Sequence, residues 1–244
     1  MKERTGPLSD VTDLVASKLQ VQLGLEVAAV HQSGASPRVE LRGGRSVVAD
    51  AVVIATPAPI ARSLATPVLS TAEDEGLARV RYLQGLTLVA ALCRPPSPRP
   101  QRVLIPRAGG SPLSSALLEP GLGASRAPEA CGLASLRATA EFAERNAHAP
   151  EESIRKDLTA ALDALRPGFS SAIEFSRVLH TPLAMPRFDV GRYREIDRFE
   201  RVQRDRRASG RRVYFAGDYL VHPGFEGAVV SGERAAAAVV QDLA

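Results

Sequence analysis

The stretch that decides the fold is Arg212-Val-Tyr-Phe-Ala-Gly-Asp218-Tyr-Leu-Val-His-Pro-Gly-Phe225-Glu-Gly-Ala-Val-Val-Ser-Gly-Glu-Arg-Ala-Ala236. It opens with a short apolar run, Val213 to Ala216, which Pro223-Gly224 separates from a stretch of helical spacing. This order predicts a strand, a turn and a helix. The first N–H groups of such a helix lack partners within it and carry partial positive charge, so they can face an electron-rich ligand. An ordinary strand and helix with nothing bound explains the pattern equally well.

The predicted helix should bury one face against the sheet. We expect small side chains at Ala228, Gly232 and Ala236 to let it approach closely. The full predicted stripe is Phe225, Ala228, Val229, Gly232, Ala235, Ala236 and Val239.

A second segment predicts a neighbouring strand far upstream. Glu26-Val-Ala-Ala-Val30 and Arg38-Val-Glu-Leu41 form a predicted hairpin, and Ala49-Asp50 leads into the apolar run Val52 to Ala55, which Thr56-Pro57 follows. Because the run carries no charge, we expect a parallel strand covered on both faces. A generic buried strand explains the run alone, but not its combination with the flanking residues.

Together these segments resemble the flavin-containing amine oxidase superfamily, which also holds protoporphyrinogen oxidases and carotenoid desaturases. Ala184-Met185-Pro186 is similar to the segment at which that family's substrate domain returns to its flavin domain. Nine residues stand in register with the family's C-terminal FAD-binding motif: Gly217, Asp218, Glu226, Gly227, Ala228, Ser231, Gly232, Ala235 and Ala236.

The resemblance implies FAD as the cofactor. It implies that the backbone of Val27 meets the adenine, that Asp218 lies at the ribityl chain or near the pyrophosphate, and that N–H groups around Phe225 and Glu226 face the flavin N1 and O2 edge. The implied cofactor-binding residues are Val27, Gly217, Asp218, Phe225, Glu226 and Ala228.

The implied fold is α/β (α+β), with two domains. Residues 1–60 and 205–244 should form a partial FAD-binding, Rossmann-like domain that begins with a helix at Pro7 to Gln22. Residues 61–204 should form a substrate domain with a mixed or antiparallel sheet flanked by helices. Its predicted elements are strands at Tyr82 to Leu92, Val103 to Ile105, Ser115 to Leu118, Gly132 to Thr139 and Ala172 to Leu179, and a helix opening at Pro150.

The family's opening strand, Gly-x-Gly-x-x-Gly turn and helix, which hold the FAD pyrophosphate, have no counterpart in this sequence. Gly121-Leu-Gly123-Ala-Ser-Arg126 lacks the third glycine and is predicted to be a loop. Three explanations stay open: a truncated sequence, one half of a split enzyme whose companion chain carries the missing section, or a degenerate domain. We therefore expect the isolated chain to bind FAD weakly or not at all.

The resemblance implies an FAD-dependent oxidoreductase that transfers a hydride from a hydrophobic substrate to the flavin. The amine-oxidase subgroup carries a lysine where this chain has Thr87, and a tryptophan where it has Leu179 and His180. These departures favour the protoporphyrinogen-oxidase or desaturase-like branch. The alternative is a non-catalytic domain of the same fold that binds a hydrophobic ligand or a protein partner. The sequence assigns no catalytic residue and fixes neither substrate, electron acceptor nor oligomeric state.

Composition bounds the partners. The chain has 244 residues, is 45 % hydrophobic and carries a net charge of +4, with a pI near 9.4. Its most basic stretch, Arg198 to Arg212, interleaves acidic residues and has one aromatic, so we predict a solvated connector and no nucleic-acid partner. Peripheral contact with an anionic membrane stays open.

The remaining sequence signals are mostly negative. No apolar run is long enough to span a membrane and no signal peptide is present, so we expect a cytoplasmic protein. The four histidines show no metal-ligand spacing, which predicts no metal site. Cys93 and Cys131 are predicted to be buried thiols without a role.

Overall fold

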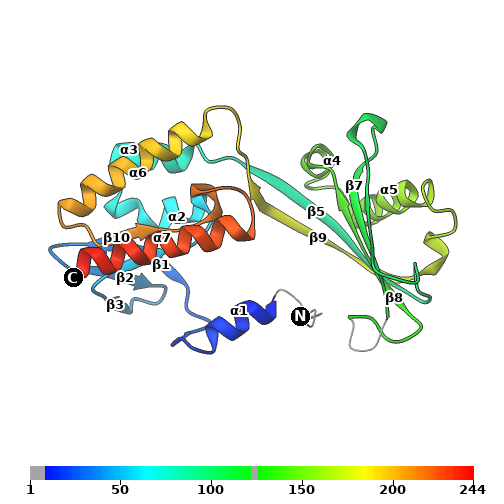
Figure 1. Cartoon of the computed structure of the whole chain (residues 1–244), viewed down its shortest axis with the longest axis horizontal. Coiled ribbons are helices and arrows are strands. Elements are labelled where there is room, and N and C mark those ends of the chain that lie inside the picture. Colours follow the sequence, from blue (N-terminus) through cyan, green and yellow to red (C-terminus); the bar gives the residue numbers. More distant parts are fainter. Residues whose placement is uncertain (1–8, 122–125) are drawn as a thin grey trace. The chain divides into compact units, whose positions relative to one another are not determined.

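The computed structural model describes residues 9–121 and 126–244, which form two compact units (Figure 1). Among the described residues, unit 1 comprises residues 83–184 and unit 2 comprises residues up to 82 together with 185–244. Residues 61–82 and 185–204, expected in the substrate domain, therefore lie in unit 2. Residues 122–125, in the predicted Gly121 to Arg126 loop, lie outside the described part.

The mixture of helices and strands confirms the predicted α+β class. The helices are α1 (Ser9–Ala16), α2 (Ala58–Ala65), α3 (Thr71–Ala78), α4 (Ala140–Arg145), α5 (Glu151–Asp163), α6 (Arg192–Ala208) and α7 (Phe225–Leu243), with short 3-10 turns η1 (Thr66–Val68), η2 (Arg107–Gly109), η3 (Ser170–Ala172) and η4 (Asp218–Leu220). The strands are β1 (Val27–Gln32), β2 (Pro37–Leu41), β3 (Ser46–Val48), β4 (Val52–Ile54), β5 (Tyr82–Leu92), β6 (Gln101–Leu104), β7 (Leu113–Pro120), β8 (Gly132–Ala138), β9 (Ile173–Pro186) and β10 (Val213–Phe215).

Unit 2 contains two small sheets. One is antiparallel, in the order β1-β2-β3, and includes the predicted hairpin. The other pairs β10 with β4 in parallel, with Val213 opposite Val52 and Phe215 opposite Ile54. The strand near residue 214 and the strand near residue 53 are thus hydrogen-bonded neighbours, as the sequence predicted.

A hydrophobic cluster of the described residues joins the elements of unit 2, and it explains why three helices belong to that unit. Ile54 and Phe215 of the parallel pair pack in it with alanines of α2, Leu77 of α3 and Phe199 of α6. The Phe199 and Phe215 rings meet edge to face, with centroids 5.8 Å apart. Because α2, α3 and α6 bury their apolar faces in this cluster, they belong to the same unit as the strands.

A buried ion cluster fastens α3 to the end of α6. Glu73 is fully buried; it closes the capping box of α3 with Ser70 and accepts hydrogen bonds from Arg211 and Gln203. The prediction of a solvated connector at Arg198 to Arg212 is therefore wrong. Most of that stretch is α6, and its Arg211 side chain is only 5 % exposed because it pairs with Glu73.

The prediction that the strand at Val52 to Ala55 is covered on both faces is also wrong, because Val53 is 43 % exposed. Val52 N donates to Arg212 O, and Ile54 O accepts from Ala216 N. In a parallel ladder alternate residues bond to the same neighbour, so the N–H and C=O of Val53 face the other edge of β4. No strand of the described chain pairs with that edge.

Two helices differ from their predicted extents or faces. The first helix ends at Ala16, not at Gln22. The Ser17 hydroxyl, just after its end, donates to Leu14 O. The Leu14 and Leu19 side chains are more than half exposed. In α7 the buried residues are Gly227, Ser231 and Ala235. Of the predicted stripe, Ala235 is buried as expected, but Ala228 and Ala236 are exposed, and the buried face passes one residue earlier, through Gly227 and Ser231.

Unit 1 is a five-stranded sheet in the order β6-β7-β8-β5-β9, and its β6/β7, β7/β8 and β8/β5 pairs are antiparallel (Figure 1). Ile154, Leu158 and Leu162 of α5 are fully buried in one cluster with leucines of β5, β7 and β8. The predicted strands are all present, and β9 runs on to Pro186. The cysteines are not buried as predicted: Cys93 is exposed and Cys131 partly so, because they lie just beyond strand ends.

Candidate functional site

The candidate site is built on the turn that joins β10 to α7. Gly217 and Asp218 follow β10 directly, beside the carboxyl end of β4, where Ala216 N donates to Ile54 O at 3.0 Å. The carboxyl ends of parallel strands are where open α/β sheets bind ligands. The structure therefore places Gly217 and Asp218, two residues of the predicted FAD-binding motif, at an edge suited to ligand binding.

Glycine is required at both ends of this turn. A Cβ on Gly217 would lie 2.3 Å from the Tyr219 ring, and a Cβ on Gly227 would lie 1.9 Å from the carbonyl oxygen of His222. Gly224 has a φ of 109°, which other residues rarely adopt. The glycines of the motif thus allow the chain to fold tightly against itself.

Two side chains hold the turn against the helix. Gly217 N donates to Ser231 Oγ at 2.9 Å, and Gly224 N donates to Asp218 Oδ2 at 3.2 Å. Ser231 is buried, whereas Asp218 is half-buried and its second carboxylate oxygen makes no hydrogen bond with any residue that the structure describes. The amino end of α7 is therefore fixed relative to the end of β10.

The amino end of α7 presents unpaired donors. Across the described part of the chain, nothing accepts a hydrogen bond from the N–H groups of Phe225, Glu226 or Gly227. The N–H of Ala228 donates to Gly224 O, and the Ala228 side chain is exposed. Three convergent N–H groups at the positive end of a 19-residue helix favour an electron-rich group.

Hydroxyl groups accompany this turn, and no sequence pattern predicted them. Tyr219 is fully buried, its hydroxyl has no partner among the described residues, and burial raises its pKa. Tyr82 OH accepts from Ala58 N at 2.9 Å, and burial raises the pKa of Tyr82 as well. The Thr56 hydroxyl, just after β4, is also buried and unpartnered in the described chain. These groups stay neutral at physiological pH and keep protons to donate.

One buried cation lies under the turn. Arg192 is 6 % exposed; it donates to Tyr219 O at 3.0 Å and pairs with Glu195 at 3.1 Å. Because it comes from the first turn of α6, no local pattern near residue 218 could have identified it. It anchors the backbone of η4 from below.

Val27 lies apart from the other predicted residues. It opens β1, opposite Leu41, with an irregular register between Val27 and Ala29. Its side chain packs on the same hydrophobic cluster as Phe215 and Tyr219. The structure thus brings five of the six predicted residues to one turn, and Val27 to a different sheet of the same unit. In residues 9–121 and 126–244, no cluster of three His, Cys, Asp or Glu residues is arranged to hold a metal ion.

Comparison with known proteins identifies the family. The sequence profile described as flavin containing amine oxidoreductase matches residues 4–240. The chain belongs to this family. Its members are flavin-containing oxidoreductases. A search of curated proteins found no match.

Solved structures share the fold at low sequence identity. A protein from Exiguobacterium sp. 255-15 to which protoporphyrinogen oxidase activity is ascribed has a TM-score of 0.75 at 15 % identity, over 97 % of this chain and 51 % of its own. Putrescine oxidase bound to putrescine has a TM-score of 0.71 at 17 % identity, covering 96 % and 53 %. Cyclohexylamine oxidase from Brevibacterium oxydans IH-35A has a TM-score of 0.66 at 15 % identity, covering 96 % and 51 %.

This chain therefore spans about half the length of the structures it resembles. At these identities the likeness establishes the fold alone. Among the helices described, none combines the length and apolar character needed to cross a membrane.

Proposed function

We propose that this chain forms one side of the FAD site of an FAD-dependent oxidoreductase acting on a hydrophobic substrate. The observation that carries the proposal is the set of three unpaired N–H groups at Phe225, Glu226 and Gly227, fixed at the carboxyl edge of β4 and β10. When bound, the flavin supplies the redox chemistry by accepting a hydride equivalent from a C–H bond. The chain's own residues bind, orient and polarise it.

The donor set fits the chemistry of a flavin. N–H groups around Phe225 and Glu226 would hold the pyrimidine O2 and N1 edge and favour negative charge there. The free oxygen of Asp218 would accept hydrogen bonds from ribityl hydroxyls, and Gly217 would let the cofactor approach the backbone. The backbone of Val27 would meet the adenine, and the exposed side chain of Ala228 would contact the cofactor by packing alone.

A companion section is part of the proposal. The free edge of β4 at Val53 and the exposed Leu14, Leu19 and Leu23 (87 % exposed) are surfaces that proteins usually cover. The half-length match to similar structures is consistent with this. We infer that a polypeptide section with the Gly-x-Gly-x-x-Gly turn, on a separate chain or in a longer form of this one, covers them and binds the pyrophosphate.

The substrate class follows from what the chain lacks. Thr87 stands in β5 where amine oxidases carry lysine, and Leu179 and His180 stand where they carry tryptophan. This supports a protoporphyrinogen-oxidase or desaturase-like reaction on an apolar molecule over oxidation of a simple amine. A cytoplasmic location belongs to the same proposal. Peripheral contact with an anionic membrane also belongs to it, because such substrates are hydrophobic.

A second candidate is a non-catalytic domain that binds a hydrophobic ligand or a protein partner. It applies if the chain acts without a Gly-x-Gly-x-x-Gly section, because most pyrophosphate contacts would then be missing. The two candidates differ in one observable property, which is whether a complex with the companion section holds flavin.

Co-expression distinguishes them. The chain is purified alone and with the product of an adjacent reading frame encoding a Gly-x-Gly-x-x-Gly protein, and flavin absorbance is measured. We expect the isolated chain to bind FAD weakly or not at all, and the complex to be yellow with one FAD per pair. A colourless complex in the presence of added FAD supports the non-catalytic alternative, and tight binding by the isolated chain contradicts the need for a companion.

A matched pair of variants tests the α7 donors. Phe225→Pro removes one N–H at the first helical position, where proline is well tolerated, whereas Phe225→Ala keeps it. Because a hydrogen bond between neutral groups is worth about 0.5–1.5 kcal/mol, and the O2 edge of oxidised flavin is neutral, Phe225→Pro should raise the dissociation constant for FAD of the complex with the companion section about two- to tenfold. Equal dissociation constants for the two variants would show that this N–H does not contact the cofactor.

A further inference from the structure

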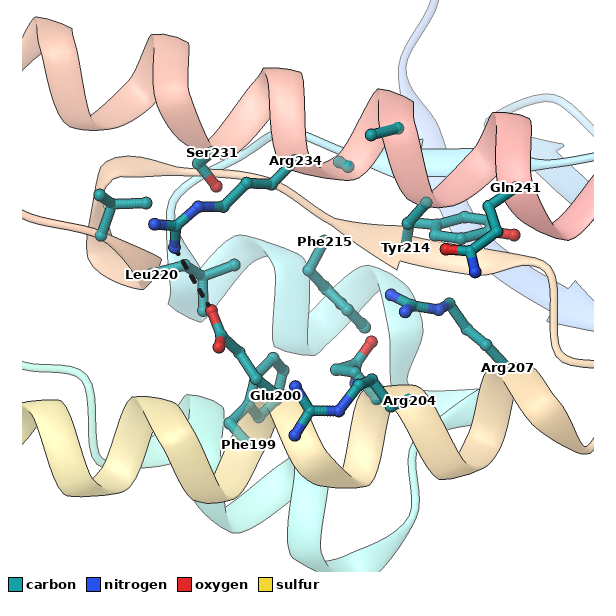
Figure 2. Close-up of a pocket in the computed structure, with 15 residues that line it drawn as sticks. Phe199, Glu200, Arg204, Arg207, Tyr214, Phe215, Leu220, Ser231, Arg234 and Gln241 are labelled. Carbon is teal, nitrogen blue, oxygen red and sulfur yellow. Dashed lines mark ion pairs between the residues drawn. The ribbon is translucent and has the colours of Figure 1, made fainter.

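A groove runs between α6 and α7 in unit 2, from Ser231 and the η4 turn to Gln241 (Figure 2). Its volume is about 520 Å³, within the range of sites for small organic molecules. The groove is lined by residues of α6, α7, β10 and the η4 turn.

The groove exists because the two helices have separate supports. α6 packs against α3, and α7 packs against β10 and η4, so the helices share a floor without closing on each other. Toward this gap α7 presents Ala235 and Ala238, whose side chains are too short to fill it. The floor includes Phe215, which packs edge to face on Phe199. The bottom of the groove is therefore apolar and aromatic.

The walls of the groove are cationic. Arg204, Arg207 and Arg234 line it; they face two carboxylates, Glu200 in the lining and Asp242 beside Arg207, so one arginine is in excess. Arg204 forms no ion pair or hydrogen bond with the rest of the described chain. The arginines of the wall can bind an anionic group, and the apolar floor can contact a hydrocarbon chain. The groove is therefore complementary to an amphiphilic anion.

Arg207 is fixed in orientation. Its Nε lies 3.2 Å from Asp242 Oδ2, and its guanidinium carbon lies 5.9 Å from the centre of the Tyr214 ring. Tyr214 OH donates to the same carboxylate at 2.9 Å. Arg207 is thus held by its neighbours, which leaves Arg204, and Arg234 once it parts from Glu200, to receive a ligand.

The ion pair across the groove is loose. Figure 2 shows Arg234 reaching from α7 toward Glu200 on α6, and their closest N and O atoms are 3.7 Å apart. The two side chains are 61 % and 40 % exposed, so the pair contributes little stability. An incoming carboxylate can therefore replace Glu200 as the partner of Arg234.

We propose that the α6/α7 groove binds a small amphiphilic anion, with its carboxylate between Arg204 and Arg234 and its apolar body over Phe215 and Ala238. The proposed contacts use none of the predicted cofactor-binding residues, although Ser231 and the η4 turn border both sites, and the proposal depends on neither the companion section nor the proposed oxidoreductase activity.

The test is a calorimetric titration of the full chain, without FAD, with decanoate, decanol and decylammonium. We expect saturable 1:1 binding of decanoate and no saturable binding of decanol or decylammonium. Arg204→Gln and Arg234→Gln should each weaken it about tenfold, the effect of losing a charge-assisted hydrogen bond. Ala238→Leu, which fills the groove, should abolish it. Arg198→Gln removes the same charge from an exposed position on α6 that does not line the groove, and should leave binding unchanged.

Several results would overturn the proposal. These are no saturable binding of decanoate, equal binding of decylammonium, the same effect from Arg198→Gln as from Arg204→Gln, or competition by FAD. Binding to phosphatidylglycerol vesicles without binding to free decanoate would point to a membrane surface instead. Thermal unfolding of each variant separates lost binding from lost folding, and the exposed Arg204→Gln change keeps the test valid if Ala238→Leu unfolds.

Discussion

Replacing Gly227 by alanine should destabilise the chain, although alanine is the better helix former. Gly227 is buried in the first turn of α7. A Cβ there would lie 1.9 Å from the carbonyl oxygen of His222 and 3.0 Å from its carbonyl carbon. Both are backbone atoms, which cannot rotate away as a side chain can. The segment before α7 must therefore move or the helix must tilt.

The structure sets the expected magnitude. Ordinary van der Waals contact begins near 3.4 Å, so the backbone must move by about 1.5 Å. Such overpacking costs about 1–3 kcal/mol, and a shift of this size belongs at the upper end. Alanine recovers about 1 kcal/mol of helix propensity. The net loss is about 2 kcal/mol, which lowers Tm by about 4–8 °C in a chain of this length.

Gly232 in the same helix provides the control. A Cβ at Gly232 meets no atom within 4 Å, so Gly232→Ala keeps only the propensity gain of about 1 kcal/mol and should raise Tm by about 2–4 °C. Thermal unfolding followed by circular dichroism compares the two variants with the wild type. Shifts of the same sign in both variants would refute the reasoning that close backbone approach requires glycine at Gly227.

Two further perturbations test the ion cluster and a local pH effect. Glu73→Gln should cost about 3–5 kcal/mol in urea unfolding because it leaves the buried Arg211 without a carboxylate, whereas Glu75→Gln, at an exposed pair, should stay within about 0.5 kcal/mol; similar losses would contradict this. Hydrogen bonding to Ser170 holds the pKa of Asp163 below its ordinary value, so its stabilisation is present above that value and is lost as pH falls through the lower folded pKa. The difference in Tm between wild type and Asp163→Asn should shrink on acidification below about pH 4, and a difference independent of pH would count against this role.

The strands could be predicted from the sequence because their signals are local. The run at Val213 to Ala216 and the run at Val52 to Ala55 are apolar and bounded by turn residues, and they pair as expected. The buried face of α7 could not, because small residues occur in adjacent pairs at 227/228, 231/232 and 235/236. Helical periodicity fits both faces equally. Only the contacts of Gly227 with His222 and of Ser231 with Gly217 select one.

Long-range partners account for the other differences. Glu73 and Arg211 are 138 residues apart, so no local pattern could show that the basic stretch would be half buried. The buried hydroxyls of Thr56 and Tyr219 and the hydroxyl of the half-buried Tyr82 come from three separate segments. The exposure of Val53 depends on which strands are available to pair, and an apolar run alone does not contain that information.

The connection between the units affects how the chain folds. The polypeptide enters unit 1 through β5 and leaves through β9, and these strands are neighbours in one sheet. Once they pair, Arg81 and Arg187 are brought within hydrogen-bonding distance, with N to O at 2.8 Å. Pairing of β5 with β9 holds the two ends of the intervening segment together. The assembly of unit 2 therefore no longer bears most of the entropy cost of closing that loop. A short tight hairpin in place of residues 83–184 should therefore leave unit 2 able to fold.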